Sequence, residues 1–235
     1  MAEPKGLLAV WMDVPPQNEE EFNDWYNTDH VPERLAIPGF QSARRYVVQE
    51  GASPEERGAD PSLLAKEGRP KYLALYALDS VDVLQTEVYK MALANPTPWT
   101  QRVRRYHTTV RNVYRQIFPD AGAPDDGQAA DPPEFLLAVQ MDVDPEQEAE
   151  FNDWYNQEHC PMLLSVPGML GARRFEAVVG EPKYAAFYEI ESPEVPESSG
   201  WVRARETPWR KGVEPYTRNR KRDMYRLILS EEASR

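Results

Sequence analysis

Two histidines of this 235-residue chain stand in nearly the same surroundings. His30 and His159 each follow a Trp-Tyr-Asn triplet and each precede a proline by two positions. An imidazole titrates near neutral pH, so it can take a proton from a phenol or an enolisable carbonyl compound and deliver it elsewhere. Tyr26 and Tyr155 lie one helical turn earlier, where a hydroxyl could hold a substrate oxygen or orient the imidazole. These four residues are the predicted catalytic groups.

The same residues also allow a structural interpretation. Because both copies keep His, Tyr, Trp and Asn together, these side chains could lock a helix end onto a sheet. The imidazole would then bond a backbone group that the following proline leaves free. Trp25 and Trp154 could line an aromatic substrate pocket, although large repeated aromatic side chains usually belong to the core. The repeat permits one site in each copy and does not say which copy works.

An arginine pair follows each motif, at Arg44-Arg45 and at Arg173-Arg174. Because side chains alternate across a strand, one member of each pair should face inward or toward a helix. An inward Arg45 or Arg174 could bind a substrate carboxylate or phenolate through two hydrogen bonds. The alternative is a salt bridge to a helix acid such as Asp24.

Positions at which the two copies differ add further candidates, since a single active site needs only one copy of its chemistry. Trp11 aligns with Gln140, and His107 aligns with Thr217. Asp13 lies on the same strand face as Trp11. We therefore include Trp11, Asp13 and His107, with Trp25 and Trp154, among the predicted substrate contacts.

Three other differences receive a neutral interpretation. Glu33 and Arg34 are replaced by Met162 and Leu163 in the second copy, which we interpret as drift at a rim. Cys160 is expected to be a small buried side chain and not a nucleophile.

The histidines must be carried by a helix. Phe22, Tyr26 and His30 fall four residues apart, on one helical face. Pro32 disfavours helical geometry at Val31, so we expect the helix to kink or stop there. A Pro-Gly pair then turns the chain into the next strand.

Short apolar runs predict the strands. LLAVWMDV at 7–14 recurs as LLAVQMDV at 136–143, and each run is followed by a helix. Three further strands and a second helix complete each copy. The strands are expected at 40–49, 71–78, 108–118, 169–179, 183–190 and 220–229, and the helices at 81–94 and 196–205.

Each copy therefore has the order β-α-β-β-α-β of a ferredoxin-like unit, which leaves one sheet face bare. We predict an α+β fold in which two such repeats, 1–118 and 135–235, pack sheet to sheet as an intramolecular barrel. Residues 119–134 form the predicted linker. A polar insertion at 50–70, absent from the second copy, is expected to cover something or to be mobile.

The composition describes a folded, acidic protein. Hydrophobic residues make up 41% of the chain, which argues against disorder. The formal net charge of −12 repels phosphate backbones and anionic membranes, so neither nucleic acid nor membrane is an expected partner. The lone cysteine suits a reducing compartment, and the N-terminus does not resemble a secretory signal. We therefore expect a cytoplasmic location.

Familiar cofactor motifs do not occur in the sequence. Its three histidines lack HxH, HxxxH or HExxH spacing, so they do not make the usual zinc or non-haem iron ligand sets. Neither a glycine-rich phosphate loop, a GxSxG elbow nor a dinucleotide fingerprint is found. We expect no metal and no cofactor, although one histidine would suffice to ligate a haem.

The run F-x-x-W-Y-x-x-x-H-x-P followed by P-G, at 22–39 and again at 151–168, resembles the signature of the EthD-like branch of the dimeric α+β barrel superfamily. Members usually build the barrel from two chains, so the resemblance implies a dimer fused into one chain. Related barrels include cofactor-free oxygenases acting on polycyclic phenols, dehydratases, cyclases, isomerases and haem-degrading enzymes. Fold alone does not choose among them.

These observations predict a cofactor-independent enzyme that binds a small apolar or aromatic oxygenated compound in the barrel. It would act by proton transfer, in dehydratase, isomerase, lyase or oxygenase chemistry. Two alternatives are a non-catalytic ligand-binding or accessory barrel and a haem-binding barrel. The expected partner is a small-molecule substrate, and the expected state is a monomer with pseudo-twofold symmetry or a further homo-oligomer.

Overall fold

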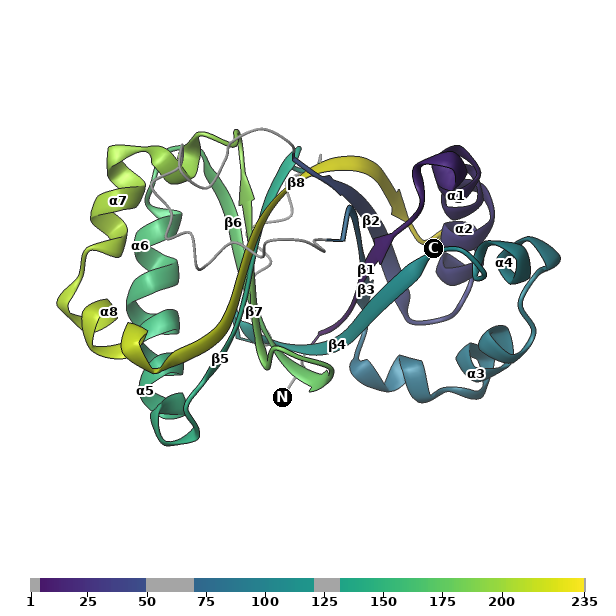
Figure 1. The fold of residues 1–235 in the computed structure, drawn as a ribbon. Coiled ribbons are helices and arrows are strands. Elements are labelled where there is room, and N and C mark those ends of the chain that lie inside the picture. The colour runs from purple at the N-terminus through teal and green to yellow at the C-terminus, as the bar shows by residue number, and fades with distance from the viewer. Residues whose placement is uncertain (1–4, 50–69, 121–131, 235) are drawn as a thin grey trace.

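The structure, a computed structural model, describes residues 5–49, 70–120 and 132–234 (Figure 1). Residues 50–69 of the predicted insertion and residues 121–131 of the predicted linker lie outside these ranges. Within the described ranges, no helix is long and apolar enough to cross a membrane.

Eight antiparallel strands form a closed barrel, which confirms the number and approximate places of the predicted strands. Their order around the barrel is β1-β3-β2-β8-β5-β7-β6-β4. The strands are β1 (Gly6–Asp13), β2 (Phe40–Val48), β3 (Tyr72–Leu78), β4 (Thr108–Phe118), β5 (Phe135–Val143), β6 (Met169–Val179), β7 (Tyr184–Ile190) and β8 (Thr217–Glu232).

The helices cover the barrel on two opposite sides, with α1 to α4 on one side and α5 to α8 on the other (Figure 1). They are α1 (Glu19–Trp25), α2 (Val31–Leu35), α3 (Glu87–Ala94), α4 (Pro98–Val103), α5 (Glu148–Trp154), α6 (Cys160–Leu164), α7 (Ser199–Arg205) and α8 (Pro208–Val213). Short 3-10 turns precede or follow them: η1 (Pro16–Asn18), η4 (Val81–Gln85), η5 (Pro145–Gln147), η7 (Val195–Glu197) and η8 (Glu214–Tyr216). π-Helical turns η2 (Tyr26–His30) and η6 (Tyr155–His159) join α1 to α2 and α5 to α6.

Strand order is the same in the two halves of the chain. The first half runs β4-β1-β3-β2 and the second runs β8-β5-β7-β6. The halves join twice, where β2 pairs with β8 and where β4 pairs with β6. Each strand therefore offers one face to the barrel interior and the other to its own helices. Three separate core clusters result, one under each helical layer and one inside the barrel.

The helix does not stop at Pro32, which was one of the two predicted outcomes, because a π-helical turn carries the chain past it. The Val31 N–H donates to the Tyr26 carbonyl, five residues back, and Val31 keeps right-handed helical angles. Proline lacks an N–H and crowds the preceding turn, and the wider π turn accommodates both effects. The second half repeats the arrangement before Pro161.

The substrate chamber expected inside the barrel is not found among the described residues. Buried side chains fill the interior, including Trp11, Tyr46, Tyr114 and Phe187. A residual cavity of about 40 Å³ remains within this cluster, beside Arg44 and Glu189. The interior is therefore a packed core and not a binding chamber.

A buried ion cluster lies in this interior core. Glu189 is 2% exposed. Its Oε1 accepts a hydrogen bond from Arg44 Nη1 at 2.9 Å and another from Arg173. The corresponding residue of the first half is Ala77. One carboxylate thus compensates two guanidinium groups drawn from both halves of the barrel.

We predict that Glu189→Gln lowers the free energy of unfolding by about 3 kcal/mol, because it leaves two guanidinium groups without a counter-charge in a buried site. Urea unfolding would measure the loss. The matched control is Glu176→Gln, since Glu176 pairs with the half-exposed Arg115 and such surface pairs contribute about 1 kcal/mol or less. Equal losses in the two variants would contradict the prediction.

Candidate functional site

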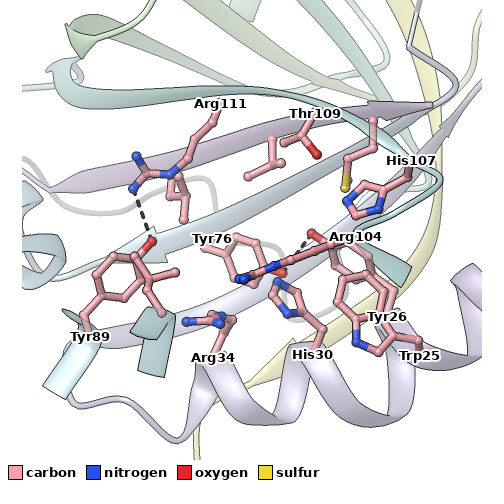
Figure 2. A pocket seen from close by; sticks show the side chains of 14 residues that line it. Trp25, Tyr26, His30, Arg34, Tyr76, Tyr89, Arg104, His107, Thr109 and Arg111 are labelled. Atoms are coloured by element: carbon pink, nitrogen blue, oxygen red, sulfur yellow. Dashed lines mark hydrogen bonds between the residues drawn. The ribbon is translucent and has the colours of Figure 1, made fainter. Parts of the chain in front are cut away.

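A cavity of about 260 Å³ lies in the first half, between the outer face of the sheet and the helices that cover it (Figure 2). It is therefore outside the barrel. Apolar and aromatic side chains line it together with basic groups and no acid. They are Leu8, Val10, Met12, Leu93, Trp25, Tyr26, Tyr76, Tyr89, Thr109, His30, His107, Arg34, Arg104 and Arg111.

Strand alternation decides which predicted residues reach this cavity. On β1, Leu8 and Met12 face the helices and the cavity. Trp11 and Asp13 alternate with these residues along β1, so their side chains lie on the opposite face of the strand. Trp11 belongs to the interior core, and Asp13 Oδ1 accepts a hydrogen bond from the backbone N–H of Lys71 at 2.7 Å. These two predicted substrate contacts are therefore not brought to the cavity.

The π-helical turn brings His30 to the wall of the cavity (Figure 2). Its ring lies 4.7 Å from the Trp25 ring and 5.0 Å from the Tyr26 ring, centroid to centroid. Nδ1 is buried and makes no hydrogen bond, and Oε2 of Glu33 lies 3.8 Å from it. Burial lowers the pKa of His30 well below its usual range, and the nearby positive charge of Arg34 lowers it further. The imidazole is therefore neutral at pH 7.

His107 faces the same cavity from the start of β4 (Figure 2). Its Nδ1 lies 2.9 Å from the Val103 carbonyl oxygen. Because a carbonyl only accepts, a neutral His107 must carry its hydrogen on Nδ1, which leaves Nε2 with a free lone pair. Two of the predicted site residues, far apart in sequence, are thus brought to one cavity.

Two buried tyrosines form the floor of the cavity. The hydroxyls of Tyr26 and Tyr76 are 3.0 Å apart. Burial raises the pKa of Tyr26, and it raises the pKa of Tyr76 well above its usual range. Both hydroxyls therefore stay protonated, and one hydrogen of the pair remains available to a ligand oxygen.

The predicted anion anchors Arg45 and Arg174 are occupied elsewhere. Arg45 is 1% exposed, and its guanidinium donates to the side-chain oxygens of Asn27 and of Asn23, the latter at 2.9 Å. It also lies 4.2 Å from the centre of the Tyr26 ring. Arg174 makes the same contacts in the second half. Arg45 and Asp24, both within the described ranges, form no salt bridge, and the substrate role of Arg45 and Arg174 stays a prediction.

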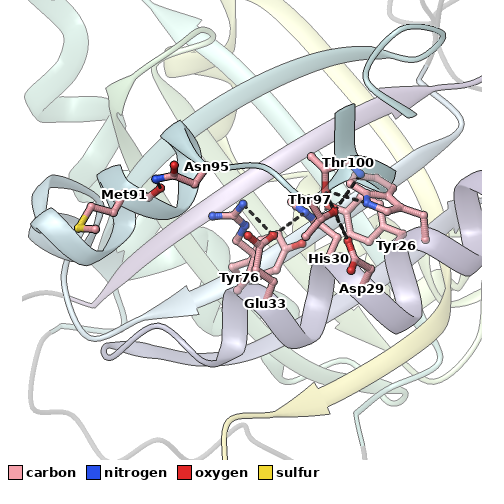
Figure 3. Close-up of polar contacts among 11 residues, drawn as sticks. Tyr26, Asp29, His30, Glu33, Tyr76, Met91, Asn95, Thr97 and Thr100 are labelled. Atoms are coloured by element: carbon pink, nitrogen blue, oxygen red, sulfur yellow. Dashed lines mark hydrogen bonds and ion pairs between the residues drawn. The ribbon is translucent and has the colours of Figure 1, made fainter. Parts of the chain in front are cut away.

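Trp25 serves the core and the cavity at once. Its indole N–H donates to the Thr100 hydroxyl at 3.0 Å, and the Thr97 hydroxyl donates to Asp29 at 2.9 Å (Figure 3). These bonds tie the π turn to α4. Its ring stacks near His30 and closes one wall of the cavity.

Sequence reasoning missed the three arginines of the cavity. Arg34 is 3% exposed, so its predicted place at a rim is wrong. Its Nη2 donates to Glu33 at 3.2 Å, while its Nη1 is buried without a hydrogen-bond partner. Arg104 and Arg111 lie at the exposed mouth, where Arg111 donates to the Tyr89 hydroxyl at 3.2 Å. The replacement of Arg34 by leucine in the second copy was the available signal.

The second half repeats the aromatic setting of the histidine. His159 is 8% exposed and stacks on Trp154, with ring centroids 4.6 Å apart. The hydroxyls of Tyr155 and Tyr188 are 3.1 Å apart. Burial again lowers the histidine pKa well below its usual range. These side chains are thus brought together twice, as the repeated motif predicts.

The charges differ between the halves. Leu163 stands where the first half has Arg34. Glu214 pairs with Arg210 at 2.5 Å and with Arg220 at 3.5 Å, so an acid compensates these two arginines near His159. Cys160 is buried, as expected, and burial raises the pKa of its thiol to about 12. In the part of the chain that the structure describes, no three His, Cys, Asp or Glu side chains gather as a metal site.

No family model and no curated protein matches the chain. Solved structures do. A protein of Fusobacterium nucleatum subsp. nucleatum, provisionally assigned as a monooxygenase, is 11% identical, with a TM-score of 0.61 over 99% of this chain and 96% of that one. An anthrone oxidase-like protein is 11% identical, with a TM-score of 0.63 over 99% and 94%. A variant chlorite dismutase of Candidatus Nitrospira defluvii is 10% identical, with a TM-score of 0.60 over 97% and 92%. These similarities show a shared α+β barrel fold.

The lowered pKa values of His30 and His159 predict how stability depends on pH. In the unfolded chain each imidazole takes up a proton near pH 6.5, whereas in the folded chain His30 and His159 remain neutral well below that pH. The unfolded state then binds more protons, so stability falls as the pH drops through 6.5, by about 1 kcal/mol per histidine between pH 7.5 and 5.5.

Urea unfolding at both pH values, on the wild type and on His30→Asn and His159→Asn, would measure this dependence. Between pH 7.5 and pH 5.5, the free energy of unfolding of each variant should fall by about 1 kcal/mol less than that of the wild type. The carboxylates contribute equally to the wild type and to each variant, so their effect cancels in this comparison. The same loss in wild type and variants would contradict the prediction.

Proposed function

We propose that the chain is a fused dimer of two ferredoxin-like repeats, 1–118 and 135–235, joined by a linker at 119–134, of the EthD-like branch of the dimeric α+β barrels. The identical strand order in the two halves supports this proposal. So do the equivalent junctions of β2 with β8 and of β4 with β6. A homodimer of such units would place the same two junctions between chains.

The cavity of the first half is, in this proposal, the active site of a cofactor-independent enzyme. It binds a small apolar or aromatic oxygenated compound and acts by acid/base proton transfer. One observation carries the proposal: His30, neutral and with Nδ1 buried without a partner, shares a cavity of about 260 Å³ with His107. A neutral imidazole at a cavity wall is competent to accept a proton.

The cavity residues suggest how the reaction proceeds. Leu8, Met12 and Trp25 provide apolar walls for the body of the substrate. His30 or His107 takes a proton from a phenol or from a carbon beside a carbonyl, and the electron pair of the broken bond moves toward the oxygen. The Tyr26–Tyr76 hydroxyl pair donates a hydrogen bond to that oxygen as its charge grows. The same imidazole returns the proton at a different atom, which gives isomerisation, or to a leaving hydroxide, which gives dehydration.

The first half is the working half in this proposal. Its histidine faces a cavity with a second histidine, whereas the position of His107 is Thr217 in the second half. His159 keeps the same aromatic contacts, so those contacts can equally serve a structural role in both halves. This repetition favours the second candidate function, a binding protein without turnover that uses the same cavity.

A haem fits this cavity poorly. About 260 Å³ is the volume of roughly nine water molecules in the liquid, which suits one small ring and not a tetrapyrrole. The interior of the barrel is packed by its own core. Neither the cavity nor the barrel interior therefore suits a haem.

A thermal-shift screen of monocyclic phenols, ketones and acids, followed by turnover assays on each hit, tests the enzyme proposal. His30→Gln should lower the turnover rate at least hundredfold, the lower end of what general acid/base catalysis contributes (about 10²–10⁴). His159→Gln should change it less than twofold, because that residue is the matched histidine of the other half. Ligand binding that persists without any turnover would support the binding protein instead.

The rate should also have an unusual pH dependence. Because burial holds the pKa of His30 in the free protein well below its usual range, the base stays neutral, and kcat/KM should remain flat from pH 8 to pH 6. An imidazole with its ordinary pKa of about 6.5 would lose much of its activity over that range. The measurement is a pH profile of kcat/KM on any substrate that turns over, and a fall centred near pH 6.5 would contradict the assignment.

A further inference from the structure

The first-half cavity carries an excess of positive charge. Arg34, Arg104 and Arg111 line it, together with two histidines, and none of its lining residues is acidic (Figure 2). The whole chain has a formal net charge of −12. A local concentration of guanidinium groups attracts anions, and the buried Arg34 among them needs acceptors for its donors, either from the protein or from a ligand.

The protein supplies only part of that compensation. Arg34 pairs with Glu33 through Nη2, but its Nη1 is buried and without a partner. Arg104 makes no ion pair with any residue of the described ranges, and Arg111 donates only to the neutral Tyr89 hydroxyl there. Buried polar groups are nearly always satisfied, so the free Nη1 of Arg34 marks a place where a ligand acceptor is missing.

The second half shows that the fold does not require these charges. Its residue at the position of Arg34 is Leu163, and its residue at the position of Arg104 is Glu214. There, Glu214 pairs with two neighbouring arginines, Arg210 and Arg220. Arg34 and Arg104 therefore occur in one half alone, whereas the histidine, tyrosines and tryptophan are common to both.

The shape of the cavity limits the rest of the ligand. Its volume of about 260 Å³ equals roughly nine waters of the liquid, so it accommodates one ring with a short substituent. Leu8, Met12 and Trp25 make the walls apolar. The arginines are arranged with Arg34 deep in the site and with Arg104 and Arg111 at the exposed mouth.

We infer that the ligand of this site is a monocyclic organic acid whose carboxylate binds Arg34, with Arg104 and Arg111 drawing the anion to the mouth. The inference rests on the proposed function, since it names the substrate class of the same cavity. A planar guanidinium matches a planar carboxylate through parallel hydrogen bonds. The positive field explains why acids enter a protein that otherwise repels them.

Calorimetry with matched probes tests the inference. Benzoate and cyclohexanecarboxylate are compared at pH 7.5 with benzamide and cyclohexanecarboxamide, which have nearly the same shape but no charge. The acids should bind at least tenfold more tightly than the amides. Arg34→Leu, which installs the residue of the second half, should weaken acid binding at least tenfold and change amide binding less than twofold.

Two further variants keep the test decisive. Arg102→Leu is the control, because Arg102 lies on α4, outside the cavity, and pairs with Glu21; it should change neither affinity. If Arg34→Leu does not fold, Arg104→Gln at the exposed mouth should weaken acid binding about threefold and reduce its salt dependence.

Amides that bind as tightly as acids, acid binding that survives Arg34→Leu, or no acid binding at millimolar concentration would each overturn the inference. Failure of the proposed function looks different. Acids that bind through Arg34 but are never turned over contradict the enzyme and support the inference. Turnover of neutral compounds that depends on His30 supports the enzyme and contradicts the inference.

Discussion

The buried guanidinium of Arg45 is the contact on which the site depends. It is held by the amide oxygens of Asn23 and Asn27 and lies 4.2 Å from the centre of the Tyr26 ring. A guanidinium group withdrawn from water is costly unless its donors are satisfied, so this contact allows only one position for the helix over the strand. The π-helical turn begins at Tyr26 and ends at His30. By holding the start of that turn on β2, the arginine determines where the imidazole lies.

Comparing the two halves of the barrel distinguishes the residues that maintain the fold from those that occur at one site only. Arg174 repeats the contacts of Arg45, and His159 repeats the stacking of His30. These shared features maintain the helix on the sheet. Arg34 and His107 occur in the first half alone, and both line its cavity. The second half therefore acts as an internal comparison within one chain.

Much of the fold could be predicted from the sequence, and much of the site could not. The apolar runs and the repeated helix motif predict the eight strands in their order along the chain, because period and turn residues are local signals. The passage of the helix through Pro32 depends on a non-local balance between packing and hydrogen bonding, which those signals do not contain. Whether a cavity opens inside or outside the barrel depends on how completely side chains fill each layer, which the sequence pattern does not contain. Trp11, predicted to contact substrate, lies in the filled interior core, whereas Arg34, predicted to lie at a rim, lines the cavity.

In our proposal, His30 is a neutral imidazole at the wall of a cavity that takes an organic acid. Nitrogen-15 NMR of the imidazole groups, recorded from pH 7.5 to pH 5 with and without benzoate, tests it most directly. We expect His30 without ligand to stay neutral through the range near pH 6.5 in which an ordinary imidazole titrates, and benzoate to shift the His30 and His107 signals while the His159 signal is unmoved. A His30 resonance that titrates near pH 6.5 and does not respond to benzoate would contradict it.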